Sequence, residues 1–109
     1  MSYDQHLADR IRERLAGEDA ITEKAMFGGI AFFSSGNMAV GVGRDGLMVR
    51  VGPGAEADAL AQPHARVFDM TGRPMKGWVL VEPAGIESDD RLGEWVARGL
   101  SFAGSLPPK

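Results

Sequence analysis

The sequence predicts a two-layer α+β domain, in which helices pack against a largely antiparallel sheet. Two patterns and the chain length lead to this prediction. Apolar residues recur every four positions at the start of the chain, which is typical of an amphipathic helix. From residue 24 onward, short apolar runs alternate with glycine-containing turns, which is the pattern of sequential antiparallel strands. The chain has 109 residues, the length of one domain, so we expect a single domain over residues 1–109.

The first predicted element is a helix. Tyr3, Leu7, Ile11 and Leu15 recur every four residues, and charged residues fill most positions between them. Residues at this spacing lie on one face of a helix, so we expect that face to pack on the sheet. Gly17 follows the series, and glycine is favoured directly after a helix. The helix should therefore end just before Gly17.

The pattern then changes to that of strands. Residues 24–33 (KAMFGGIAFF) are predicted to form one strand, and the polar turn SSGN separates it from a second strand at 38–43 (MAVGVG). The turn RDG precedes a third strand at 47–51 (LMVRV). Short turns of this kind join neighbouring antiparallel strands. Residues 52–62 (GPGAEADALAQ) follow as a short helix, because proline suits a first helical turn and alanine favours the helix body.

The last part of the chain contains two more strands and a final helix. Residues 65–70 (ARVFDM) alternate apolar and polar side chains, and the turn-prone segment TGRPMKG leads into a strand at 78–83 (WVLVEP). Ser88 can cap the final helix. The apolar stripe of this helix comprises Leu92, Trp95, Val96, Gly99 and Ala103. The predicted order is α-βββ-α-ββ-α, which gives a five-stranded antiparallel sheet.

The composition excludes several classes of protein. The chain has no cysteine, which excludes disulfides, thiolate metal sites and cysteine nucleophiles. No segment has the ~18 apolar residues of a membrane span, and the charged N-terminal residues do not resemble a secretory signal. We therefore expect a cytoplasmic protein with no membrane partner. The net charge of −3 disfavours binding to nucleic acid.

Several segments, taken in order, resemble one known family. They are KAMFGGIAFF with GNMAVGV, then LMVRVGP, GRPMKGWVLVEP and LGEWVARGLSFAGSLPPK. Together they resemble the N-terminal domain of TfoX (also called Sxy), a bacterial competence regulator, and stand-alone proteins that consist of this domain. The resemblance runs from about residue 20 to the C-terminus. It implies a two-layer α+β fold similar to that of type III secretion chaperones and YjbR-like proteins, and it brings no catalytic residues with it.

The adjacent glycines Gly28 and Gly29 lie inside the first predicted strand. A phosphate-binding loop would need the spacing GxxxxGK[ST] or GxGxxG where a strand meets a helix, and neither spacing occurs here. Glycine within a strand typically marks a bulge, a bend or a close approach of another backbone. We therefore expect a bend in this strand, and the alternative is a ligand site at Lys24, Phe27 and the two glycines.

A second candidate site surrounds the segment TGRPMKGW. Arg73 and Lys76 lie shortly before Trp78. Cations beside an exposed aromatic ring can bind an anion or stack on a base, and Arg50 and Arg66 would add to the same site. The simpler interpretation, which we favour, is a hairpin turn whose charges keep it soluble.

The methionines are the third feature of interest. Met26, Met38, Met48, Met70 and Met75 lie in or beside predicted strands. Methionine in such positions is usually a flexible filling of the core, whereas exposed methionines favour adaptable surfaces for partners. We expect core filling for most of them.

The sequence favours an interaction domain over an enzyme. The residues form no recognisable catalytic set, cofactor motif or metal site, so we expect a non-enzymatic protein without a cofactor or metal. The first hypothesis is a small regulatory domain that binds a protein partner, or itself as a homodimer, through a face or an edge of the sheet. One alternative is an accessory transcriptional regulator, as for TfoX itself, which would contact DNA through the cations of the second candidate site. Another is a small-ligand-binding protein with a pocket near Phe27, Gly28 and Trp78.

Overall fold

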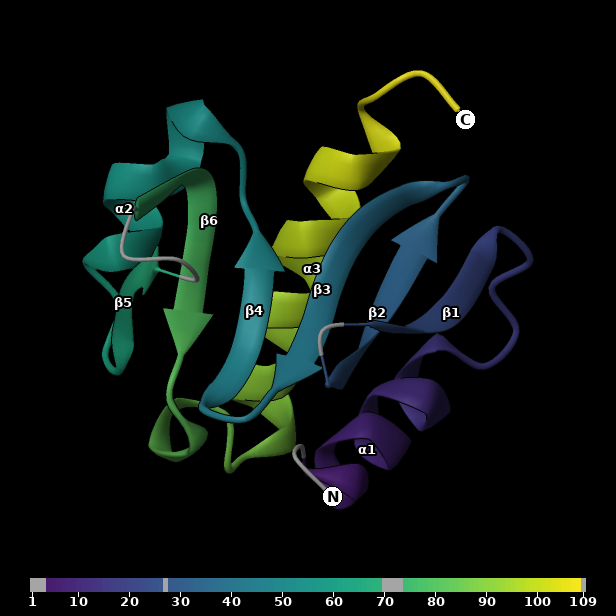
Figure 1. Cartoon of the computed structure of the whole chain (residues 1–109), viewed down its shortest axis with the longest axis horizontal. Helices are drawn as coiled ribbons and strands as arrows, with labels where there is room; N and C mark the ends of the chain where they lie inside the picture. Colours follow the sequence, from purple (N-terminus) through teal and green to yellow (C-terminus); the bar gives the residue numbers. More distant parts are fainter. Residues whose placement is uncertain (1–3, 27, 70–73, 109) are drawn as a thin grey trace.

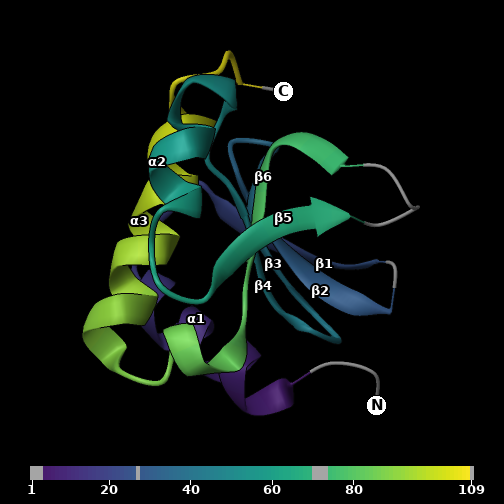
Figure 2. The same cartoon turned by 90° about the vertical axis from the view of Figure 1, so that its left-hand side faces the viewer.

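The computed structural model describes residues 4–26, 28–69 and 74–108, which form a two-layer α+β domain (Figure 1). Six strands in this part of the chain form an antiparallel sheet in the order β1-β2-β3-β4-β6-β5. The helices α1, α2 and α3 lie on one face of this sheet (Figure 2). The bounds are α1 Gln5–Leu15, β1 Ile21–Met26, β2 Gly29–Ser34, β3 Asn37–Gly43, β4 Gly46–Arg50, α2 Glu56–Leu60, β5 Ala65–Asp69, β6 Pro74–Val81 and α3 Asp89–Gly104, with short 3-10 helices η1 Pro53–Ala55 and η2 Pro83–Gly85. The predicted α+β class is confirmed.

Polar side chains cap the N-termini of the longer helices, and the cap at Ser88 is the one that the sequence predicts. The Asp4 carboxylate accepts a hydrogen bond from the backbone N–H of Leu7 at 3.1 Å, and the Ser88 hydroxyl accepts one from the N–H of Arg91 at 3.1 Å. Each bond satisfies a backbone donor that has no partner within the helix. Gly17 adopts a φ of +92° just after α1, which glycine does without strain.

The glycine pair does not bend one strand, as the sequence predicted, but lies at a hairpin turn between two strands. β1 and β2 pair along their whole length, with Met26 opposite Gly29, and Gly28 lies in the turn with a φ of +76°. β1 is an edge strand with mostly exposed side chains, so it lacks the apolar alternation by which a half-buried strand is recognised. The predicted number of five strands is therefore wrong, and the described residues follow the order α-ββββ-α-ββ-α.

Gly29 also marks the close approach of a neighbouring backbone. A Cβ atom at Gly29 would overlap the carbonyl oxygen of Val42 on β3. A glycine within a strand can mark a close approach of another backbone, and at Gly29 this approach is confirmed.

The second half of the chain extends the sheet beyond β4. After β4 the chain passes through η1 and α2 to the far edge, where it forms β5. It then returns as β6, which pairs with β5 on one side and with β4 on the other. The outer strands of the sheet are therefore β1 and β5.

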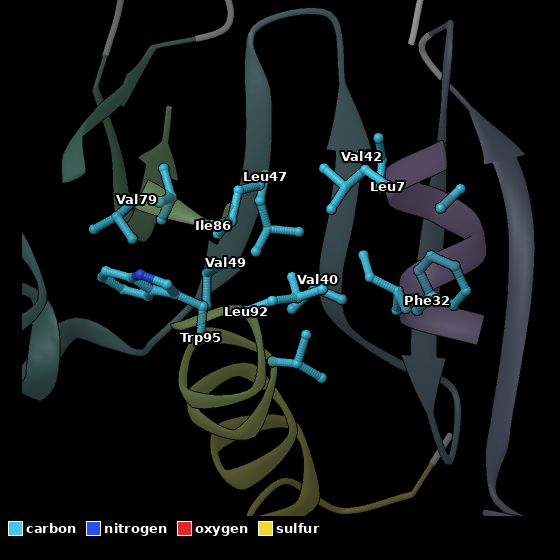
Figure 3. Packing of buried hydrophobic residues seen from close by; sticks show 14 of the residues in the cluster. Leu7, Phe32, Val40, Val42, Leu47, Val49, Val79, Ile86, Leu92 and Trp95 are labelled. Carbon is cyan, nitrogen blue, oxygen red and sulfur yellow. The ribbon is translucent and has the colours of Figure 1, made fainter. Parts of the chain in front are cut away.

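The main core lies between the sheet and the helices (Figure 3). Successive residues of a strand point to opposite faces of the sheet, and Phe32, Val49 and Val79 point to the helices. Trp95 of α3 lies beside Val49 and Val79 and is 2% exposed, whereas Phe32 lies beside α1. The buried amide of Asn37 donates a hydrogen bond to a backbone carbonyl near the C-terminus at 2.9 Å, so its polar group is satisfied.

Arg10 joins α1 to the segment in front of α3. Its guanidinium donates to the carbonyl oxygens of Ile86 at 2.9 Å and Glu87 at 3.2 Å. It also donates to the carboxylate of Asp89 at 3.1 Å. A single side chain therefore connects two helices that lie far apart in the sequence.

Arg12 joins α1 to the edge strand β1. Its Nε–H donates to both carboxylate oxygens of Glu23, at 3.1 and 2.9 Å. The hydrogen bonds that Arg12 donates to the carboxylate of Glu23, together with one to Asp9, raise the pKa of Arg12 above its ordinary value. This pair holds the exposed strand β1 close to α1.

Candidate functional site

The face of the sheet opposite to the helices carries a second group of apolar residues. No helix of the described residues covers this face (Figure 2), which we call the helix-free face. Ala31, Gly41, Met48 and Leu80 form one row across β2, β3, β4 and β6. Because Val49, next to Met48, points to the core, alternation along the strand turns this row to the helix-free face.

Methionine and aromatic side chains surround a small hollow on this face, which we call the methionine hollow. It is lined by Met26, Ile30, Ala31, Met38, Met48, Phe68, Met75 and Trp78. The four methionines and Trp78 are half-buried. The hollow has a volume of about 80 Å³.

Some apolar residues of the helix-free face are buried although they lie outside the main core. Phe68 and Leu80 are 8% and 6% exposed, and the ring of Phe68 packs against that of Trp78. The ε-methyl groups of Met38 and Met48 lie over Gly41, so that a Cβ atom there would be 3.0 Å and 2.9 Å from them. Because methionine side chains are flexible and adapt to their neighbours, this cover can be rearranged at small cost.

A basic residue stands at each end of the apolar row. Lys24 of β1 lies opposite Ala31, and Arg66 of β5 lies opposite Leu80. Arg66 forms an ion pair with Glu82 at 3.7 Å. Within the described residues, no carboxylate pairs with Lys24. The β1 margin of the helix-free face thus carries a cation that no described carboxylate pairs with, whereas the cation at the β5 margin is balanced by Glu82.

Arg50 stands at the end of β4 between two aromatic rings. Its guanidinium carbon lies 6.0 Å from the ring centre of Trp78, its partner on β6, and 5.3 Å from the ring centre of Phe102 on α3. Trp78 in turn packs against Phe68, with 6.2 Å between ring centres. None of the described carboxylates pairs with Arg50. The rings hold the guanidinium by cation–π attraction and leave its N–H donors available to an anion.

The structure brings several of the predicted site residues to the helix-free face. Trp78 lines the methionine hollow, Arg50 lies beside it, and Lys24 lies at the edge of the same face. Lys76 is exposed on β6 between Met75 and Trp78.

The remaining candidate residues are the two glycines, Phe27 and Arg73. Gly28 lies in the β1–β2 hairpin turn and Gly29 is the first residue of β2, so they offer no helix N-terminus to a phosphate. Phe27 and Arg73, the other two predicted site residues, lie outside the described residues.

Sequence reasoning missed most of the apolar part of the site. It assigned the methionines mainly to the core, whereas Met26, Met38, Met48 and Met75 line the methionine hollow; Met70 lies outside the described residues. Phe68 and Leu80 were not singled out. The alternation in ARVFDM and WVLVEP places both on the face opposite to the core, but only once the pairing of β5 with β6 is known.

An open groove between α2 and α3 is the main alternative site on the other side of the molecule. It has a volume of about 780 Å³ and includes Asp58, Glu94 and Arg98 in its lining. These charges are already used, because Arg98 pairs with Asp58 at 3.0 Å and Glu94 with Arg91 at 3.8 Å. The groove therefore offers a ligand fewer unpaired charges than the helix-free face does.

Other kinds of site find no support in the described part of the chain. Its histidine, aspartate and glutamate side chains nowhere gather in a group of three or more that could hold a metal ion. Its helices are too short or too polar to cross a membrane.

The comparisons with known proteins identify the family of this chain. Neither the curated proteins nor the solved structures gave a match. The family model of the TfoX N-terminal domain matches residues 13–103, which include every strand of the sheet and nearly all of α3. The resemblance predicted from the sequence is confirmed, and the chain belongs to the TfoX N-terminal domain family.

Proposed function

We propose that this protein is a non-enzymatic cytoplasmic interaction domain that binds a protein partner through the helix-free face. Membership of the TfoX N-terminal domain family supports a regulatory or interaction role in general. The methionine hollow carries the more specific proposal. Its methionines and Trp78 are half-buried on a face that no helix of the described residues covers.

The side chains of this face are of the kinds found at protein–protein interfaces. Methionine and aromatic residues are enriched at protein interfaces, where flexible thioethers adapt to the shape of a partner. Moving Met38 and Met48 away from Gly41 would enlarge the hollow and expose more apolar surface to a partner side chain. Burial of that surface would supply the free energy of association.

The size of the hollow argues against a small-molecule ligand. Its volume is about 80 Å³, whereas pockets for drug-sized ligands measure ~300–1,000 Å³. One apolar side chain of a partner, such as leucine, is a better match to this space than a metabolite.

Binding of nucleic acid is the second candidate function, and Arg50 is the observation that favours it. A guanidinium beside Trp78 and Phe102 resembles the mixed cationic and aromatic surfaces that bind single strands. The net charge of −3 opposes it, because a polyanion is repelled at long range. Binding to a dT12 oligonucleotide that weakens steeply with added salt would establish this function.

The proposal can be tested by comparing two variants in affinity capture from a nuclease-treated lysate of the source organism. The double variant Met38→Gln, Met48→Gln keeps the side-chain size on the helix-free face but removes its apolar character. Ala97→Gln introduces the same polar side chain in the groove between α2 and α3, where Ala97 is exposed. Thermal melts of the free proteins would show that both variants remain folded.

We expect the double methionine variant to lose a protein that the wild type and Ala97→Gln both retain. A partner lost only from Ala97→Gln would place binding on the helix side and contradict the proposal. Retention of every captured protein by the folded double variant would contradict it as well.

A further inference from the structure

We infer that the helix-free face recognises an acidic, amphipathic segment of a protein partner, and that Arg50 receives a carboxylate of that segment. The inference rests on the proposed function and adds the chemistry of the partner. It follows from the charges around the methionine hollow and from the way in which Arg50 is held.

The arrangement of charges favours an acidic partner. Lys24 and Arg66 stand at the two ends of the apolar row, on opposite edge strands. Arg50 adds a third cation beside the hollow. Arg66 already pairs with Glu82 at 3.7 Å, whereas no described carboxylate pairs with Lys24 or Arg50, so these two cations carry the argument. A partner with apolar residues at its centre and carboxylates on either side would therefore match this face in both charge and polarity.

The position of Arg50 favours a specific contact over a diffuse attraction. Its guanidinium lies 6.0 Å from the ring centre of Trp78 and 5.3 Å from that of Phe102. An arginine held in this way loses little conformational freedom when it binds, and its planar group matches a carboxylate with two parallel hydrogen bonds. Trp78 also lines the hollow, so a carboxylate at Arg50 lies next to the apolar anchor.

The same guanidinium could receive a phosphate, but the surroundings favour a peptide. The hollow beside Arg50 is lined by methionine side chains, which suit aliphatic and aromatic side chains of a protein. A nucleic acid would need cations along the whole path of its backbone, whereas a peptide carboxylate needs only the one guanidinium that binds it.

The inference can be tested with random dodecapeptides displayed on phage, selected on the immobilised wild-type protein. Selected peptides are synthesised, and their affinities are measured for the wild type and for folded variants. Arg50→Gln removes the proposed carboxylate contact, and Arg50→Lys keeps the charge without the planar group. Arg44→Gln is the matched control, because Arg44 is exposed in the β3–β4 turn and does not line the hollow. The double variant Met38→Gln, Met48→Gln reports whether a peptide occupies the helix-free face.

We expect the selected peptides to combine aspartate or glutamate with apolar residues. Arg50→Gln should weaken their binding at least about tenfold, Arg50→Lys should weaken it less, and Arg44→Gln should leave it within about twofold, as for a distant surface charge. The double methionine variant should weaken it too.

Different experimental outcomes would overturn the inference alone or both the inference and the proposed function. Peptides that need the methionines but lack acidic residues, or that bind Arg50→Gln as well as the wild type, would overturn the inference and leave the proposed function intact. Peptides unaffected by the methionine changes would overturn both. Both would also be overturned if no peptide were selected, whether or not dT12 bound to the protein.

Discussion

At the scale of single residues, the neighbouring strand determines which amino acid Gly29 can be replaced by. A Cβ atom at Gly29 would overlap the carbonyl oxygen of Val42, which is part of the β3 backbone. We expect Gly29→Ala to lower the free energy of unfolding by about 3 kcal/mol, the upper part of the usual range for overpacking. Urea denaturation followed by circular dichroism would measure this loss.

Gly41→Ala provides the matched control for Gly29→Ala. Here the added methyl group would meet the ends of Met38 and Met48, which can move aside because the methionine side chain is flexible. The loss should stay below about 1 kcal/mol. Equal losses in the two variants would show that backbone overlap is not the cause at Gly29.

The glycine pair also shows what local sequence does not determine. A glycine can serve as a bend inside a strand or as a turn between two strands. The segment MFGGI is apolar on both sides of the glycines and lacks the Asn-Gly or Asp-Gly pair that marks a two-residue hairpin. The choice is made by the pairing of β1 with β2, which is a long-range property of the sheet.

At the scale of elements, the side chain of Arg10 links α1 to the start of α3 by hydrogen bonds. It donates to the carbonyl oxygens of Ile86 and Glu87 and to the carboxylate of Asp89. Arg10→Lys keeps the charge but cannot reach all of these acceptors at once. We expect it to lower the free energy of unfolding by about 1–2 kcal/mol, measured in urea.

Arg91→Lys is the control for Arg10→Lys. Arg91 forms an exposed ion pair with Glu94 at 3.8 Å on α3, and such pairs contribute little to stability. Its loss should be below about 0.5 kcal/mol. If Arg10→Lys lowered the free energy of unfolding no more than this control, the link between α1 and α3 would not depend on the geometry of the guanidinium.

The elements that sequence reasoning predicts well are those with local signals. Ser88 indicates the start of α3, and Gly17 indicates the end of α1. These signals are local because a capping residue acts on the backbone within a few residues. β1 carries no such signal. It lies at the edge of the sheet and exposes most of its side chains, so the predicted strand begins only at Lys24 and leaves out Thr22 and Glu23.

At the scale of the whole molecule, the candidate site depends on the order of the strands. Arg50 and Trp78 meet because β6 lies between β4 and β5. The local sequence patterns do not predict that strand order. The sequence singles out Arg50 and Trp78 as a cation and an aromatic residue, but the methionines become a site only when the sheet turns them to the face without helices. Residue types were therefore predictable, and their assembly was not.

The central claim is that the helix-free face is where a partner binds. The most direct test is NMR spectroscopy of the protein with ¹³C-labelled methionine and alanine methyl groups, recorded in buffer and in nuclease-treated lysate of the source organism. Met38 and Met48 report on the helix-free face, and Ala57, exposed on α2, reports on the helix side. We predict that the Met38 and Met48 methyl signals shift or broaden in the lysate while the Ala57 signal does not. Unchanged methionine signals, or a change confined to Ala57, would contradict the claim.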